Sequence, residues 1–168
     1  MIMESKTIIL TEKQIEQKLQ RIAYEIVENN FNELAIALVG VVGNGSVLAK
    51  RLATLLEKIT GEKIMTAEIG INKQQPLAAP ITLSVEPASI SNHVVILVDD
   101  VLNSGKTMQY ALVKLLEQPT RQIKTVALID RKHRRYPIRC DYTGLTLSTT
   151  LQEHVDVDLE KEGVAYLI

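Results

Sequence analysis

Apolar residues follow two different spacings along the chain, and each spacing predicts a different kind of element. They recur at helical spacing after a capping box that begins at Thr11, and again from Ser46 to Ile59. A third helix is expected from about Lys106 to Glu117. The continuous apolar run of residues 34–39 predicts a strand buried on both faces, as in a parallel sheet, and further strands are expected at residues 64–71, 93–98 and 125–129. Because strands and helices alternate, we expect an α/β fold in which crossover helices flank the sheet.

Two regions lack a sustained pattern. Residues 72–92 contain three prolines and are predicted as a loop with short β pieces. The chain after Asp130 is predicted as short strands and turns. Since 168 residues is an ordinary size for one domain, residues 1–168 are expected to form a single domain.

The composition excludes several classes of protein. With 46% hydrophobic and 23% charged residues, the chain is not disordered, collagen-like or a coiled coil. Its net charge of −1 at pH 7 argues against general attraction to nucleic acid and leaves room for a local basic patch. The longest apolar stretch is far below the roughly 20 residues that a membrane span needs, and the single cysteine cannot form an internal disulfide. We therefore expect a soluble, cytoplasmic protein with no membrane partner.

The segment with the most chemical character joins a predicted strand to a predicted helix. Asp99 and Asp100 follow the apolar run, and Asn103-Ser104-Gly105-Lys106-Thr107 leads into the helix. Ligands of open α/β sheets bind beyond the carboxyl ends of the strands, and a helix N-terminus suits phosphate. Two carboxylates would repel a phosphate, whereas the hydroxyl groups of a ribose, with a divalent cation nearby, would satisfy them. The pattern predicts a sugar phosphate site; the alternative is an ordinary strand-turn-helix in which the acids merely end the strand.

Two other phosphate-binding motifs are excluded. A Walker A loop that ends in Gly105-Lys106-Thr107 needs a glycine at position 100, which is Asp100 here. The glycines at positions 40, 43 and 45 run in the reverse order of the dinucleotide-binding fingerprint.

The same residues carry a resemblance to a known family. The apolar strand, the two acids and Ser-Gly-Lys-Thr are similar to the phosphoribosyl pyrophosphate (PRPP) signature of type I phosphoribosyltransferases. Residues 21–26, 38–40, 48–52 and 130–139 resemble one branch of that family, the pyrimidine-operon regulators that double as uracil phosphoribosyltransferases. The resemblance implies a parallel β-sheet flanked by helices, with a small hood subdomain built from the N- and C-terminal segments.

The resemblance also implies roles for particular residues. Asp99 and Asp100 would be the catalytic acids that hold the ribose hydroxyls of PRPP. Its 5′-phosphate would lie in the loop Asn103, Ser104, Gly105, Lys106 and Thr107. Mg²⁺ would bind with PRPP and neutralise the leaving pyrophosphate, without a dedicated set of protein ligands. The loop that grips pyrophosphate would be Val41, Val42, Gly43, Asn44 and Gly45. Relatives of this fold form dimers or larger assemblies, so a homo-oligomer is expected.

Three residues bear on the choice of nucleobase. Enzymes that act on 6-oxopurines generally place an acid where this chain has Asn103, which favours a pyrimidine, and uracil in particular. Tyr142 aligns with an aromatic residue that stacks on the base in related enzymes; packing against the edge of the sheet is the alternative. Arg131 would line the base pocket, unless it is simply a solvated arginine.

Loop composition and charge favour a second hypothesis. In the similar branch the pyrophosphate loop contains a lysine and an arginine, whereas residues 41–45 contain neither, and the flap segment after Ile71 offers only Lys73. This composition favours weak or absent turnover, as in a nucleotide sensor that regulates pyrimidine genes through messenger RNA. A basic turn would then be the RNA-binding patch, with a solvated or oligomer-facing surface as the alternative; it comprises Arg131, Lys132, His133, Arg134, Arg135 and Arg139.

Overall fold

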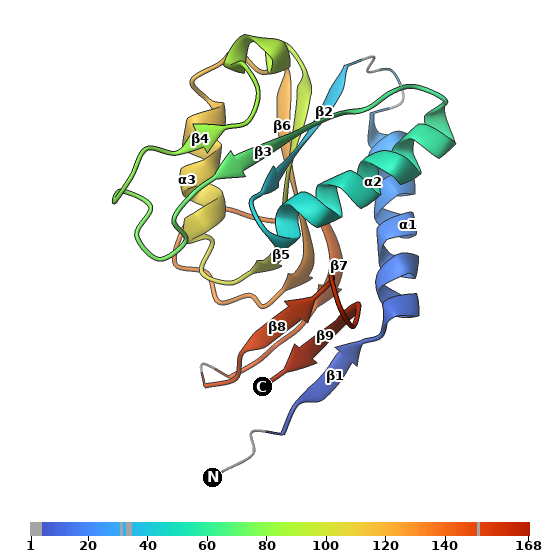
Figure 1. Cartoon of the computed structure of the whole chain (residues 1–168), viewed down its shortest axis with the longest axis vertical. Coiled ribbons are helices and arrows are strands. Elements are labelled where there is room, and N and C mark those ends of the chain that lie inside the picture. Colours follow the sequence, from blue (N-terminus) through green and yellow to red (C-terminus); the bar gives the residue numbers. More distant parts are fainter. Residues whose placement is uncertain (1–4, 31, 33–34, 151) are drawn as a thin grey trace.

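Six strands form the main sheet of the computed structural model, which describes residues 5–30, 32, 35–150 and 152–168. The strands lie in the order β4-β3-β2-β5-β6-β7 (Figure 1). Five of them are parallel: the four expected strands and β7, which lies in the region predicted only as short strands and turns, while the edge strand β4 runs antiparallel to β3. Their bounds are β2 (Ile36–Val41), β3 (Met65–Gly70), β4 (Thr82–Leu83), β5 (Val94–Leu102), β6 (Gln122–Asp130) and β7 (Tyr142–Thr146).

Within the described residues, three α-helices lie between the strands: α1 (Glu12–Asn29), α2 (Asn44–Thr60) and α3 (Lys106–Leu115). The predicted capping box of α1 is confirmed, because the Thr11 hydroxyl accepts from the Gln14 amide and the Gln14 side chain accepts from the Thr11 amide. A short 3₁₀ helix, η1 (Pro87–Ile90), lies in the proline-containing segment.

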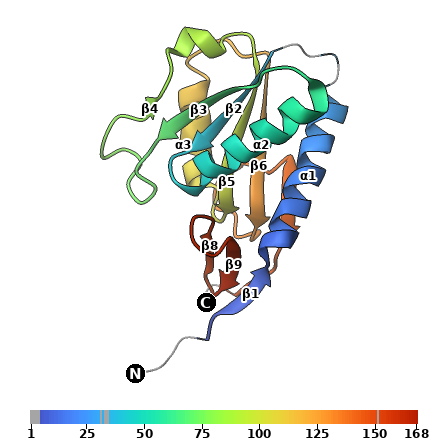
Figure 2. The same cartoon turned by 45° about the vertical axis from the view of Figure 1, so that its right-hand side comes forward.

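The two faces of the sheet bury two separate hydrophobic cores. Neighbouring residues of a strand point to opposite faces, so Leu38 and Ile96 pack under α1 and α2. Val39 and Leu97 pack on the other side, with apolar residues of α3. Figure 2 shows α1 and α2 side by side over one face of the sheet. Burial on both faces explains why these strands read as continuous apolar runs.

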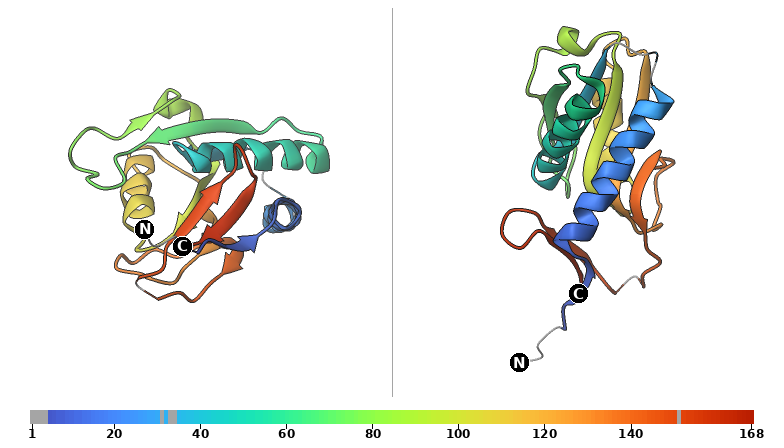
Figure 3. Two further views of the ribbon diagram at one scale, coloured as in Figure 1. Left: turned by 60° about the horizontal axis from the view of Figure 1, so that its bottom comes forward. Right: turned by 90° about the vertical axis from the view of Figure 1, so that its right-hand side faces the viewer.

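A second, three-stranded sheet is built from the two ends of the chain. It contains β1 (Thr7–Leu10), β8 (Val155–Asp158) and β9 (Val164–Leu167) in the antiparallel order β1-β9-β8. Figure 3 shows this small sheet beside the end of the main sheet, with the C-terminus just after its strand β9. This sheet joins the segments expected to form the hood, and we call it the hood. The single domain of residues 1–168 stays a prediction.

The boundaries of several elements differ from the predicted ones. The strand expected to stop before Asp99 continues to Leu102, because Val101 and Leu102 pair with β6 beyond the acids. Residue 34, where another strand was expected to begin, lies outside the described residues. Pairing between strands extends them past the point where the apolar run ends.

No helix in the described part of the chain is long and apolar enough to cross a membrane.

Substitution of Leu52 by alanine is expected to destabilise the fold strongly. Leu52 is fully buried in the core beneath α2, and removal of its side chain leaves a cavity that costs about 2–5 kcal/mol of unfolding free energy. Urea denaturation followed by circular dichroism measures the change. The matched control is Leu77→Ala, because Leu77 is 83% exposed and its loss is expected to cost less than about 0.5 kcal/mol. Equal costs for the two variants would contradict the assignment of the core.

Candidate functional site

A cleft of about 320 Å³ lies at the carboxyl ends of the central strands. It brings together the two acids, the loop that follows them and the first turn of α3. Val155 of the hood strand β8 forms part of its wall. The lining residues are Lys73, Asp99, Asp100, Val101, Leu102, Asn103, Ser104, Gly105, Lys106, Thr107, Met108 and Val155. The predicted PRPP-binding segment therefore lines one cleft at the expected edge of the sheet.

Asp99 and Asp100 occupy the last part of β5 in different environments. Asp99 is buried, with 3% of its surface exposed, and its Oδ1 accepts from the Asp100 amide at 2.9 Å. The Asp100 side chain is 15% exposed, and its Oδ1 accepts from the Val101 amide at 2.8 Å. Burial raises the pKa of Asp99 to about 7; the negative charge of Asp100 adds to the rise, and Lys73 opposes it. Protonation of Asp99 is thus poised near neutral pH.

Lys73 pairs with both acids from the segment that follows β3. Its Nζ lies 3.2 Å from Asp99 Oδ1, 3.4 Å from Asp99 Oδ2 and 3.9 Å from Asp100 Oδ1. The side chain is 44% exposed, so it reaches the acids from the open side of the cleft. The ammonium offsets part of the repulsion between two adjacent carboxylates.

The loop from Asn103 to Thr107 turns sharply into α3. Gly105 has a φ of +86°, a left-handed conformation that glycine adopts without steric cost. The Ser104 hydroxyl accepts from the Lys106 amide at 3.2 Å, and the Ser104 carbonyl accepts from the amides of Arg135 and Tyr136. Lys106 and Thr107 form the start of α3, where amides without helical partners suit an anion.

The loop from Val41 to Gly45 lies next to the acids. Asn44 Nδ2 donates to Asp100 Oδ2 at 2.9 Å and to the Val157 carbonyl of the hood at 2.8 Å. Gly45 approaches β5 so closely that a β-carbon there would lie 2.7 Å from the Val98 carbonyl oxygen and 3.2 Å from Asp99 Oδ1. Val42 is half exposed, and Gly43 caps the N-terminus of α2. The structure brings this loop to the predicted place with neutral side chains only.

Arg131 is buried among hydrogen-bond acceptors. Its guanidinium donates to Asn103 Oδ1 at 2.9 Å, to the Thr149 hydroxyl at 3.0 Å, and to the carbonyls of Thr150 and Glu153. Only 6% of the residue is exposed. Arg131 therefore ties the 103–107 loop to the segment that leads into the hood, and it is not a solvated arginine. Contact with a base stays a prediction.

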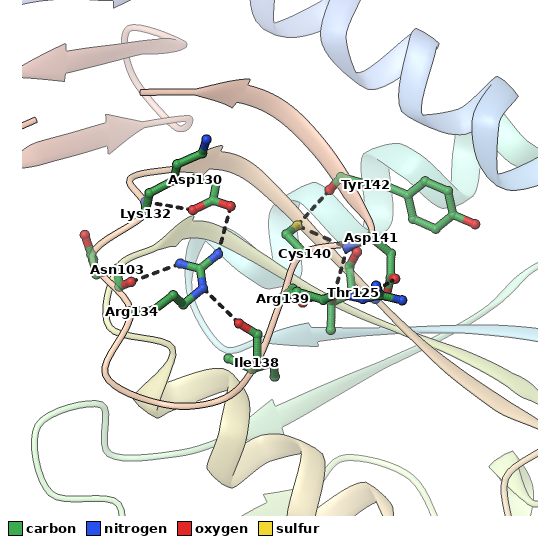
Figure 4. A network of polar contacts seen from close by, with 10 residues as sticks. All are labelled: Asn103, Thr125, Asp130, Lys132, Arg134, Ile138, Arg139, Cys140, Asp141 and Tyr142. Carbon is green, nitrogen blue, oxygen red and sulfur yellow. Dashed lines mark hydrogen bonds and ion pairs between the residues drawn. The ribbon is translucent and has the colours of Figure 1, made fainter. Parts of the chain in front are cut away.

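Some of the cations in the basic turn are paired with other groups of the protein (Figure 4). Arg134 forms an ion pair with Asp130 at 2.8 Å and donates to the carbonyls of Asn103 and Ile138. The side chain of Arg139 is 87% exposed and lies 3.6 Å from Asp141. Lys132 and Arg135 are also exposed. The outward positive charge of the turn is therefore smaller than the sequence suggests.

Tyr142 does not line the cleft. It begins β7, pairs with Val126, and is 3% exposed in the core beneath α1. Its hydroxyl lies 3.4 Å from the side-chain amides of Asn29 and Asn30. Figure 4 shows its ring directed away from the contacts between Asn103 and Arg134. This placement, at the amino end of a parallel strand, favours the packing role over the base-stacking role.

Comparison with known proteins places the chain in a family. The sequence profile described as phosphoribosyl transferase domain matches residues 5–162. The chain belongs to the phosphoribosyltransferase family. Over 172 residues it is 35% identical to the bifunctional protein PyrR of Bacillus cereus (strain AH820). The matched region covers 95% of this chain and 93% of that relative. The protein of the same name from Bacillus mycoides (strain KBAB4) is 35% identical over 169 residues. The resemblance to that branch of the phosphoribosyltransferases is confirmed.

Solved phosphoribosyltransferases share the fold. The hypoxanthine phosphoribosyltransferase of Trypanosoma cruzi matches with a TM-score of 0.80 at 18% identity, covering 96% of this chain and 95% of that one. A hypoxanthine-guanine phosphoribosyltransferase from Bacillus anthracis matches with a TM-score of 0.76 at 18% identity, over 99% of both chains. At these identities the likeness confirms the type I fold alone.

Three placements in and around the cleft escape prediction from the sequence. Lys73 is recognisable as the basic residue of the short flap, but nothing in the sequence indicates that it pairs with acids 26 residues away. Val155 and Val157 carry no chemical signal, yet the hood places one in the wall of the cleft and the other against Asn44.

The raised pKa of Asp99 predicts a change of stability with pH. In the unfolded chain Asp99 titrates near 3.8 and in the folded protein near 7, so between these values only the folded state binds the proton. The contribution of Asp99 to stability therefore falls as pH rises from about 4 to 7, by up to about 1.4 kcal/mol per pH unit. Asp99→Asn is expected to flatten this part of the profile of unfolding free energy against pH. The control is Asp156→Asn, at an exposed position of β8; equal slopes for wild type and Asp99→Asn would contradict the prediction.

Proposed function

We propose that this protein transfers the 5-phosphoribosyl group of PRPP to a ring nitrogen of a nucleobase, with uracil as the favoured base. One observation carries the proposal: the adjacent carboxylates of Asp99 and Asp100 share a cleft with the loop from Asn103 to Thr107 at the start of α3. Carboxylates accept from ribose hydroxyls, while loop amides and hydroxyls donate to a phosphate. Membership of the phosphoribosyltransferase family supports the same activity.

The proposed reaction exchanges two bonds at C1′ of the ribose. The base nitrogen forms the new C–N bond, the C–O bond to diphosphate breaks, and diphosphate leaves with the electron pair while the base releases its N–H proton. Asp99 and Asp100 would orient the ribose, and the 103–107 loop would anchor its 5′-phosphate. Positive charge on the sugar in the transition state is favoured by the nearby carboxylates, and a fixed orientation lowers the entropic cost of reaction.

The cleft fits Mg²⁺ bound together with PRPP. Mg²⁺ in phosphate sites takes one or two carboxylates along with substrate oxygens and water, and Asp100 presents a partly exposed carboxylate to the cleft. Among the described residues no group of three or more His, Cys, Asp or Glu side chains forms a metal site by itself. When bound, the ion would neutralise charge on the departing diphosphate.

The preference for uracil rests on the PRPP loop and on the resemblance to pyrimidine-operon regulators. Asn103 stands where enzymes acting on 6-oxopurines generally have an acid, and its side-chain oxygen accepts from Arg131. Asn103 thus has no carboxylate to offer a purine. A homo-oligomer, dimeric or larger, and a cytoplasmic location are part of the same proposal.

A product assay tests the activity. Protein, PRPP and Mg²⁺ are incubated separately with uracil, hypoxanthine, guanine, xanthine, adenine and orotate, and nucleotides are measured by mass spectrometry. We expect UMP from uracil. Asp100→Asn is expected to reduce its rate by about 10²–10³-fold, because one charged group that orients the ribose is lost. Absence of every nucleotide would contradict the catalytic proposal.

A second candidate function is a nucleotide sensor that acts through RNA. It is favoured by the neutral side chains of residues 41–45 and by the three exposed cations of the basic turn: Lys132, Arg135 and Arg139. The two candidates share the ribose 5-phosphate site and differ in turnover.

Retardation of pyrimidine leader RNA in a gel, with and without UMP, tests the sensor. If the basic turn binds RNA, we expect UMP-dependent binding at moderate salt that weakens as salt rises, since phosphate contacts release counterions. A triple substitution of Lys132, Arg135 and Arg139 by glutamine should abolish it. The absence of UMP-dependent binding by the wild type would exclude this function.

A further inference from the structure

Asn44 lies where three parts of the protein meet. Its side-chain nitrogen carries two protons, and both are donated: one to Asp100 Oδ2 at 2.9 Å and one to the Val157 carbonyl at 2.8 Å. Asp100 belongs to β5, Val157 belongs to the hood strand β8, and Asn44 is the first residue of α2. One amide group therefore joins the helix, the central strand and the hood, and both of its protons are engaged within the protein.

Two glycines allow the backbone at Asn44 to lie close to the sheet. A β-carbon at Gly45 would lie 2.7 Å from the Val98 carbonyl oxygen, and one at Gly40 would lie 2.5 Å from the Gly45 carbonyl oxygen. Real β-carbons do not come so close to other atoms, so the first turn of α2 packs against β2 and β5 only because these side chains are missing. Glycines that do not form a dinucleotide-binding motif thus fix the start of the helix from which Asn44 reaches the acid.

The contact with Asn44 fixes the orientation of the Asp100 carboxylate. Asp100 Oδ1 accepts from the Val101 amide at 2.8 Å and Oδ2 accepts from Asn44, so each oxygen has one short contact. The Lys73 ammonium is farther away, at 3.9 Å from Oδ1. A carboxylate oxygen accepts more than one hydrogen bond, and the Asp100 side chain is 15% exposed. Asn44 therefore sets the direction of the carboxylate and leaves it able to accept from a hydroxyl in the cleft.

On the hood side, Asn44 meets the backbone of an edge strand. In the described hood sheet the order is β1-β9-β8, so β8 presents backbone groups to elements outside the sheet. The Val157 carbonyl accepts from Asn44, and Val155, two residues earlier in β8, forms part of the wall of the cleft. The amide that orients the acid thus also holds the hood wall beside it.

We propose that Asn44 is a positioning residue for the ribose of the ligand: it holds the Asp100 carboxylate in the direction from which the ribose hydroxyls donate, and it ties the hood to the same acid. The inference rests on the proposed function. Asn44 acts through Asp100 and does not touch the ligand. Without it the carboxylate would rotate more freely, and a fixed orientation is what makes such a contact strong. Affinity for the ribose hydroxyls would therefore fall, while affinity for the 5′-phosphate would remain.

The ratio of the affinities for UMP and 2′,3′-dideoxy-UMP, measured by calorimetry, isolates this role without any need for turnover. The two nucleotides share the base and the 5′-phosphate, and only UMP has the two ribose hydroxyls. The wild type is expected to bind UMP more tightly. Asn44→Ala should lower the ratio about tenfold, the effect of losing one hydrogen bond to a charged group. Its affinity for 2′,3′-dideoxy-UMP should stay the same, which also checks that the variant is folded.

Two further variants separate positioning from packing. Asn44→Asp keeps the shape of the side chain and replaces the donor by a carboxylate, which cannot donate to Asp100 and repels it. It is expected to lose the preference for UMP at least as completely as Asn44→Ala. Asn32→Ala is the matched control, because Asn32 is an exposed asparagine, and it should keep the wild-type ratio.

Hydrogen exchange followed by mass spectrometry tests the link to the hood. In Asn44→Ala the amides of β8 are expected to exchange faster, because the strand loses a contact that holds it to α2. The amides of β7, at the far edge of the main sheet, should keep their rates. Unchanged exchange of β8 would overturn this link.

The calorimetric results distinguish failure of the inference from failure of the proposed function. An unchanged ratio in Asn44→Ala would overturn the role of Asn44. An equal loss of affinity for both nucleotides would also overturn it, because that is the effect of a residue that only maintains the fold. If the wild type bound UMP no more tightly than 2′,3′-dideoxy-UMP, or bound neither, the proposed ribose site itself would fail.

Discussion

The burial of β5 on both faces determines where Asp99 and Asp100 lie. Val95 and Leu97 pack on one core, and Ile96 and Val98 pack on the other, so the strand is held in register between β2 and β6. The same register carries the next two residues, Asp99 and Asp100, to the carboxyl edge. The pairing and burial of β5 therefore fix the two acids next to each other at this edge of the sheet.

Adjacent acids in such a place require compensation, and the surrounding elements supply it. Backbone amides of β5, the side-chain amide of Asn44 and the ammonium of Lys73 all meet the two carboxylates. Each of these partners comes from a different part of the chain. The two carboxylates are thus held by a network of partners from several elements of the fold.

Two arginines hold the 103–107 loop against neighbouring segments. Arg131 connects Asn103 to the segment before β8, and Arg134 connects the Asn103 carbonyl to Asp130 and to the Ile138 carbonyl. Two cations that the sequence presents as part of a surface patch therefore contact the 103–107 loop instead. This use of charge explains why a basic run is a weak sign of RNA binding in a protein of nearly zero net charge.

The sequence by itself determined the α/β class, the helices and the segment that lines the cleft, because each depends on residues close together along the chain. The capping box at Thr11 and the acids before Ser104-Gly105-Lys106-Thr107 are signals of this local kind. Only the tertiary structure decided which groups Tyr142, Arg131 and Lys73 contact. An aromatic ring, a guanidinium and an ammonium each have several suitable partners, and strand order and the packing of the hood select among them. For Lys73 the selection depends on β2 lying between β3 and β5, an arrangement that no local pattern of residues encodes.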